Sequence, residues 1–155
     1  MNFCDTLFVE ALSCFFTVIS GILVYILSQR YDEYRRKPRL KYYEIRSRIK
    51  YYLLLHANLY TNPLQLADKN TEAILKRYSE ASDDMRKVGA ELAGIISSLP
   101  MTIGKTIPKK QELNDVVRYL IGISNSFYMP YNVNDTTQIR DASKDKKEIE
   151  RILNI

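Results

Sequence analysis

The side chains best suited to chemistry in this chain are basic and amide groups that could hold an anionic ligand. Arginine offers a planar fork of N–H donors that matches phosphate oxygens, and lysine offers a mobile ammonium group. Asparagine could read a base edge and tyrosine could stack on a base. The candidates are Arg77, Arg86, Lys105, Lys109, Arg118, Asn58, Asn125 and Tyr128. The asparagines have a second reading, because asparagine near a helix end commonly caps the helix or forms a turn.

Residues for catalysis or metal binding are sparse. A hydrolase triad or a metal site needs several converging histidine, cysteine or acidic side chains, and the chain has one histidine, two cysteines and no Cys-x-x-Cys. Gly-Lys-Thr at 104–106 lacks the glycine five residues earlier that a phosphate loop needs. We therefore expect no enzymatic activity, no metal and no cofactor. We expect His56 to be a core histidine, and Asp83 and Asp84 to be solvated.

An apolar segment near the N-terminus would hold the rest of the chain, with its candidate binding residues, at a membrane. From Thr6 to Ser28 the only strongly ionisable side chain is Glu10, and about 20 apolar residues span a bilayer core as a helix. A cleavable secretory signal is one alternative, but no basic region precedes the apolar run and no small-x-small site follows it. A helix buried in a soluble core is another. We predict a transmembrane segment over residues 1–28, with the span at 6–28.

The charge that follows this segment predicts its orientation. Residues 30–50 hold nine Lys or Arg and three acids, whereas no basic residue precedes the apolar run. The positive-inside rule then places the N-terminus outside a cytoplasmic membrane, with a basic juxtamembrane collar at 29–38 beside anionic lipid and a cytoplasmic domain at 39–155. Residues 51–155 hold 14 bases and 13 acids, so the chain's net charge of +5 comes mostly from the collar. A long nucleic acid is not an expected partner.

Small and polar residues of the apolar segment share one face of the predicted helix. At about 100° per residue, this stripe contains Glu10, Ser13, Cys14, Thr17, Ser20 and Gly21. Such a face lets membrane helices approach closely and hydrogen-bond, and an intramembrane acid usually faces a partner or water. Three readings stay open. Glu10 sits at the outer interface and the stripe is only a packing seam, or the stripe lines a pore in a homo-oligomer, or it meets a different protein.

The remaining sequence predicts an all-α fold, with about four helices after the transmembrane helix. Apolar residues recur at helical spacing over 39–60, 71–99 and 111–127, and in a short last helix that starts near Asp141 or Ser143. Pro38 is expected to break or kink the helix after the collar. The 71–99 helix carries a heptad-like seam suited to bundle or coiled-coil packing. The seam consists of Ile74, Tyr78, Ala81, Met85, Val88, Leu92 and Ile95.

This architecture of an N-terminal membrane helix, a basic collar and a small helical cytoplasmic domain resembles the membrane-associated effectors of type III CRISPR defence. The resemblance covers the layout of the whole chain. It implies a homo-oligomer that binds a cyclic oligoadenylate second messenger in the cytoplasmic domain and then perturbs or opens the membrane. A symmetric ring would place Glu10, Thr17 and Ser20 toward its axis. The alternative is a membrane-tethered scaffold whose 71–99 seam docks a protein partner.

Overall fold

The computed structural model describes residues 3–62, 64, 72–99, 106–127 and 137–155, and the regular elements among these residues are all helices, with no strand. The chain begins with the long apolar helix α1 (Phe3–Tyr31), followed by a π-helical segment η1 (Asp32–Arg36) and α2 (Lys37–Leu55). A short α3 (Ala57–Thr61), then α4 (Glu72–Ile96), α5 (Lys110–Ser126) and α6 (Thr137–Leu153) complete the described fold. The predicted all-α class is confirmed.

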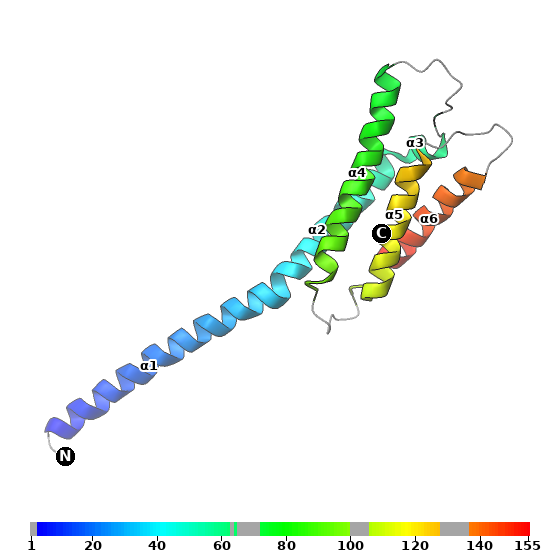
Figure 1. Ribbon diagram of the computed structural model, residues 1–155. Helices are drawn as coiled ribbons and strands as arrows, with labels where there is room; N and C mark the ends of the chain where they lie inside the picture. The colour runs from blue at the N-terminus through cyan, green and yellow to red at the C-terminus, as the bar shows by residue number, and fades with distance from the viewer. Residues whose placement is uncertain (1–2, 63, 65–71, 100–105, 128–136) are drawn as a thin grey trace.

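The helices divide between a rod and a bundle. Figure 1 shows α1 projecting away from the rest of the protein, while α2, α4, α5 and α6 lie together at the other end of the rod. In the bundle α4 packs against α2 and α5, α5 also packs against α6, and α3 lies against α6. The rod is α1, and α2, which continues from it through η1, is itself part of the bundle.

The core of the bundle comes from the apolar faces that the sequence pattern predicted. Tyr42, Ile45, Ile49 and Leu53 of α2 are buried in the same core cluster as the seam of α4 and the apolar face of α5. The buried seam residues are Tyr78, Ala81, Met85, Val88, Leu92 and Ile95. Ile74 was expected to belong to this seam and does not, because it lies near the start of α4 with 42% of its surface exposed. The first turn of α4 extends beyond its packing partners.

The expected break at Pro38 is absent. Pro38 is the second residue of α2, and the chain stays helical from Phe3 through η1 to Leu55. Within a helix, a proline lacks an N–H donor and its ring collides with the carbonyl four residues earlier. Here the π-helical segment lies directly before the proline, and Lys37 N–H donates to Asp32 O, five residues back. The wider π turn makes room for the ring, so the helix continues.

Two helix limits also differ from the sequence prediction. The helix expected over 39–60 is interrupted at His56, whose φ of −98° and ψ of 13° lie outside the helical region and separate α2 from α3. The apolar residues expected at helical spacing still face the core across this interruption, because Leu53, His56 and Tyr60 are all buried. The last helix starts at Thr137, earlier than the expected Asp141 or Ser143. Its core contacts are Ala142, Ile149 and Leu153, which are buried.

Candidate functional site

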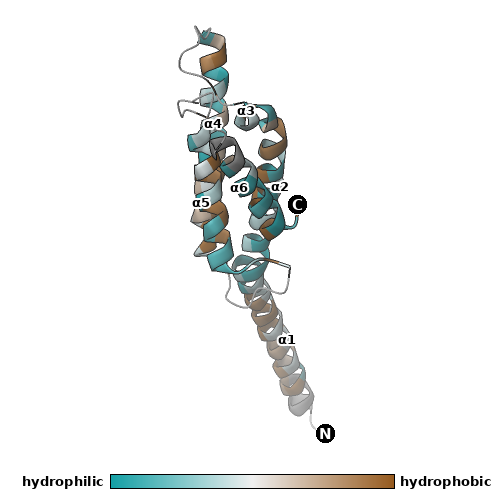
Figure 2. Ribbon diagram, turned by 90° about the vertical axis from the view of Figure 1, so that its right-hand side faces the viewer, coloured by the Kyte–Doolittle hydropathy of each residue, from teal (hydrophilic) through white to brown (hydrophobic). Residues whose placement is uncertain are grey.

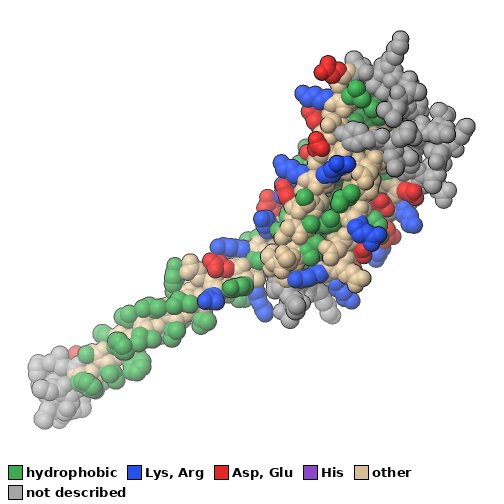
Figure 3. Space-filling model, viewed as in Figure 1, with side chains coloured by type: hydrophobic (Ala, Val, Ile, Leu, Met, Phe, Trp, Pro, Cys, Tyr) green, Lys and Arg blue, Asp and Glu red, His purple; other side chains and the backbone are tan. Residues whose placement is uncertain are grey.

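The apolar rod is the first candidate for a functional element. One helix in the described part of the chain is long and apolar enough to cross a membrane, with a mean hydropathy of 2.1 in its most apolar window and none of that window buried in the fold. Figure 3 shows hydrophobic side chains along α1, while the charged side chains gather from the end of α1 onward and over the bundle. We call residues 6–28 the candidate span. No part of the most apolar window of this helix is buried against the rest of the described chain.

The polar stripe of the candidate span is exposed along the described side chains. Glu10, Cys14 and Gly21 face outward. Thr17 Oγ1 donates to Ser13 O at 2.9 Å, and Ser20 Oγ donates to Thr17 O at 2.9 Å. These hydroxyl hydrogens are satisfied within the helix, as they need to be in hydrocarbon. A Cβ added at Gly21 would meet no atom within 4 Å. The stripe thus combines small side chains with hydroxyl groups that bond to their own helix, and a second helix could approach it closely.

The predicted ligand residues do not converge on one place. Arg86 and Asn125 meet across α4 and α5, since Arg86 donates from Nη2 to Asn125 Oδ1 at 2.9 Å and from Nε to Ser124 Oγ at 2.8 Å. Arg77 is exposed on α4, where no described residue pairs with it. Lys105 and Tyr128 lie outside the described residues. The Arg86 guanidinium therefore joins two helices of the bundle.

The remaining candidates have local roles. Lys109 stands before the first residue of α5, where its backbone N–H donates to Glu112 Oε2 at 2.8 Å and completes the N-terminal cap. Arg118 pairs with Asp115 on its own helix at 3.4 Å. Asn58 is an exposed residue of α3, and its carbonyl accepts bonds from the Thr61 and Asn62 side chains.

Sequence reasoning missed a buried hydroxyl pair beneath Arg86. Ser82 and Ser124 are both buried, with their Oγ atoms 2.8 Å apart. Ser124 Oγ also lies 3.2 Å from Ser82 O. Each serine sits on a face of its helix that carries apolar core residues, which is a signal that could have indicated a buried pair. It could not have indicated which residue on a distant helix would be the partner.

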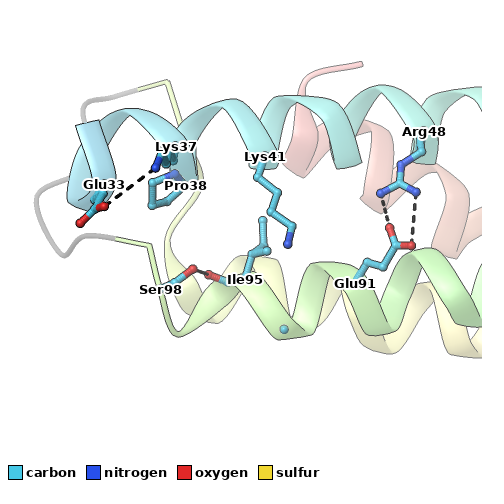
Figure 4. A pocket seen from close by; sticks show the side chains of 9 residues that line it. Glu33, Lys37, Pro38, Lys41, Arg48, Glu91, Ile95 and Ser98 are labelled. Atoms are coloured by element: carbon cyan, nitrogen blue, oxygen red, sulfur yellow. Dashed lines mark hydrogen bonds and ion pairs between the residues drawn. The ribbon is translucent and has the colours of Figure 1, made fainter. Parts of the chain in front are cut away.

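One recess among the described residues lies between the start of α2 and the end of α4. It has a volume of about 610 Å³ and is lined by Glu33, Lys37, Pro38, Lys41, Arg48, Glu91, Gly94, Ile95 and Ser98. Figure 4 shows Lys41 reaching from α2 toward α4, between an ion pair at each end of the recess. None of these side chains was predicted as a ligand residue. They belong to the predicted collar, to the part of α2 that follows it, and to the second half of α4 with the turn after it.

Of the charged groups that line the recess, only the Lys41 ammonium has no ion-pair partner among the described residues. Lys37 pairs with Glu33 at 4.0 Å, and Arg48 holds Glu91 with both terminal nitrogens, one of them 3.2 Å from Oε1. Lys41 has no ion pair or hydrogen bond with any described residue. Ser98 Oγ donates to Ile95 O at 2.8 Å and can still accept. A recess of this size with one unpaired ammonium can hold a small anionic group.

A second recess, of about 400 Å³, lies between α2 and the C-terminal end of α6. In its wall, Arg46 donates from Nη2 to Asn154 O. Glu112 lines the same recess, so a carboxylate and a guanidinium share the wall. This arrangement leaves less net positive charge for an anion than the first recess.

Histidine, cysteine and acidic side chains do not form a cluster of three or more suited to a metal ion anywhere in the described residues. Comparison of the whole chain with protein-family models, with curated proteins and with solved structures finds no match. The candidate functional elements among the described residues are therefore the apolar helix α1, the bundle and the recess between α2 and α4.

Proposed function

We propose that this protein is a single-pass membrane effector whose helical domain lies in the cytoplasm, assembles into a homo-oligomer and binds a small anionic ligand. Binding changes the arrangement of the candidate spans and perturbs or opens the membrane. One observation carries the proposal. The 610 Å³ recess is walled on one side by the helix that continues without a break into the candidate span, and on the other side by α4 of the bundle.

The continuous helix supplies the mechanical link. An anion held by Lys41 and by the α4 side of the recess would favour one spacing and angle between α2 and α4. A ligand shifts such an equilibrium only by its different affinity for the two arrangements. Because η1 and α1 extend α2 directly, a change of α2 relative to the bundle moves the candidate span as a lever.

The charge pattern supports the orientation. Nine basic residues in 30–50 follow the candidate span and none precedes it, so the positive-inside rule puts the bundle in the cytoplasm. A cytoplasmic bundle can sample soluble anionic messengers. Cyclic oligoadenylate is the ligand that the architectural resemblance implies, and its phosphates are the groups that an unpaired lysine would hold.

The 71–99 seam is less suited to a scaffold role than its sequence indicated. Tyr78, Met85 and Leu92 are buried in the chain's own core, so a partner could reach them only if the bundle opened. We therefore keep the effector as the single proposal.

The first test is ligand binding by the full chain in lipid nanodiscs. A panel of cyclic oligoadenylates, with linear oligoadenylates for comparison, is added while thermal unfolding of the bundle is followed. One cyclic ligand should raise the melting temperature of the wild type. Lys41→Ala should lose most of this shift, and Lys50→Ala is the matched control, because Lys50 is an exposed lysine of α2 outside the recess. An equal shift in both variants would contradict the recess as the ligand site.

The second test is membrane permeability. Liposomes that contain the full chain and a trapped dye should release the dye when the bound ligand is added. Glu10→Ala should reduce release if the polar stripe lines the pathway, whereas Val9→Ala, on the neighbouring position outside the stripe, should leave it unchanged. A wild-type protein that binds ligand without any release would refute the effector role while leaving the binding site intact.

A further inference from the structure

The side of α2 that points away from the core carries large apolar residues, and no described element covers it. Five large side chains on this helix are 37–62% exposed, namely Leu40, Tyr43, Tyr51, Leu54 and Leu55. The core residues Ile45, Ile49 and Leu53 lie about half a turn away around the helix. Figure 2 shows α2 at the edge of the bundle, so the side away from the core is open. We call Leu40, Tyr43, Ser47, Tyr51 and Leu54 the outer face.

The π-helical segment sets the direction of the outer face relative to the candidate span. A π turn closes over five residues rather than four, so it accommodates one extra residue and shifts the phase of all later residues back by about 100°. With Glu10 taken as zero and this shift included, Leu40 lies near 20°, Ser47 near 0° and Leu54 near 340°.

The outer face therefore continues the polar stripe of the candidate span. Thr17, Gly21 and Ser28 occupy the same arc on α1, at about 340°, 20° and 0°. Without η1 the outer face would point about 100° away from the stripe. The inserted residue therefore aligns the two surfaces along one side of a helix more than fifty residues long. This side presents small and polar residues in the candidate span and mostly large apolar residues in α2.

Charges beside the outer face match a second, parallel copy. Arg39 and Glu44 flank the face on opposite sides, and neither pairs with any residue that the structure describes. They are five residues apart. In a parallel coiled coil, the g residue of one helix lies beside the e residue of the partner helix, which is five residues further along. Such pairs form interhelical salt bridges. Arg39 of one copy would therefore face Glu44 of the next.

We infer that the outer face of α2 is a homo-oligomer interface that extends the contact between candidate spans into the cytoplasm, with parallel copies of this chain as the partner. The inference rests on the proposed homo-oligomer and adds the surface by which the bundles meet. Copies inserted in the same membrane with the same orientation have parallel helices at matched depth. Like residues of the outer face then lie at the same height, and the recess on the other side of α2 remains open.

Cysteine cross-linking tests the inference in membranes. In a background with Cys4→Ser and Cys14→Ser, single cysteines are placed at Ser47 and at Leu54 and treated with a short bis-maleimide. Both should give a cross-linked dimer. Ala90→Cys, at an exposed position of α4, is the control and should give at least fivefold less. Equal dimer yields at the three positions would overturn the inference. It would also be overturned if Ser47→Cys formed cross-links only to other proteins and none to a second copy of this chain.

The charge pair and the π-helical segment give two further arms. Glu44→Arg should lower the Ser47→Cys dimer yield several-fold, and adding Arg39→Glu should restore it. Deletion of Tyr34 removes the inserted residue, so a wild-type Cys14 in a Cys4→Ser chain should still cross-link while Ser47→Cys should lose its dimer. Circular dichroism and thermal unfolding confirm that each variant is folded. Failure of the double exchange to restore the yield would contradict the parallel pairing even if the deletion variant does not fold.

These outcomes separate the inference from the proposal beneath it. Cross-linking at Cys14 without cross-linking at residues 47 and 54 would confine the contact to the candidate spans and refute only the outer face. Absence of cross-links at all three positions would refute the homo-oligomer as well.

Discussion

The Nε2 atom of His56 lies 3.0 Å from Oδ2 of Asp84, which ties the end of α2 to the middle of α4. The imidazole also stacks on Tyr52, with ring planes 8° apart and centroids separated by 5.9 Å. His56 is a core histidine, as the sequence predicted, with 8% of its surface exposed. The prediction that Asp84 is solvated holds only in part, because its side chain is 34% exposed but its carboxylate is also the partner of the buried ring.

Removal of this partner should cost stability. Asp84→Ala would leave the His56 Nε2 position without its hydrogen bond in a largely buried setting, which should lower the free energy of unfolding by about 1–3 kcal/mol. Urea unfolding of the full chain, followed by far-ultraviolet circular dichroism, measures this. Asp83→Ala, at the exposed neighbouring residue, should change the value by less than about 0.5 kcal/mol. Equal effects of the two variants would contradict a structural role for the pair.

The seam of α4 should be energetically uneven. Met85 has no exposed surface, so Met85→Ala should destabilise the bundle by about 2–5 kcal/mol through lost burial and a residual cavity. Ile74 shares the heptad spacing but is 42% exposed, and Ile74→Ala should cost less than about 1 kcal/mol. Chemical unfolding of the two variants shows whether the loss of stability depends on burial of the side chain or only on its position in the heptad pattern. A large loss at Ile74 would mean that another surface covers the start of α4.

Arg86 is expected to act as a helix-to-helix link. Arg86→Ala removes two hydrogen bonds to Ser124 and Asn125 of α5, so the free energy of unfolding should fall by about 1 kcal/mol. Arg77→Ala, at an exposed arginine of the same helix, should leave it unchanged. A ligand-binding Arg86 would behave differently. Its alanine variant would keep the melting temperature without ligand and lose the increase that ligand causes.

Asp145 should make the bundle depend on pH. Burial raises the pKa of Asp145, and the nearby Asp141 raises it further while Lys144 opposes the change. A carboxyl whose folded-state pKa lies above the unfolded value binds its proton more tightly when folded. Its contribution to stability is therefore fully present below the unfolded value and is lost as pH rises through the folded-state pKa. Asp145→Asn should be more stable than the wild type at pH 7.

The same variant provides the pH test. The difference in melting temperature between Asp145→Asn and the wild type should shrink as the pH is lowered from 7 toward 3. Asp83→Asn serves as the exposed control and should show no such trend. A constant difference across this range would indicate that Asp145 is ionised in the same way in the folded and unfolded states.

The sequence by itself determined the helices, the apolar segment and most of the core. Helical spacing identifies Ile45, Met85 and Leu120 as inward-facing, because a helix fixes which residues share a side whatever it later packs against. The length and composition of residues 6–28 indicate a span for the same local reason. The all-α class follows from these two signals.

Only the tertiary structure decided which faces meet and which are left open. Pro38 could be accommodated because a π turn directly precedes it, and Arg86 became a link because α5 brings Ser124 beside it. The recess around Lys41 and the open outer face of α2 depend on α4 occupying one side of α2. Such relationships join residues far apart in the chain, and the packing of helices against one another sets them, so no local pattern encodes them.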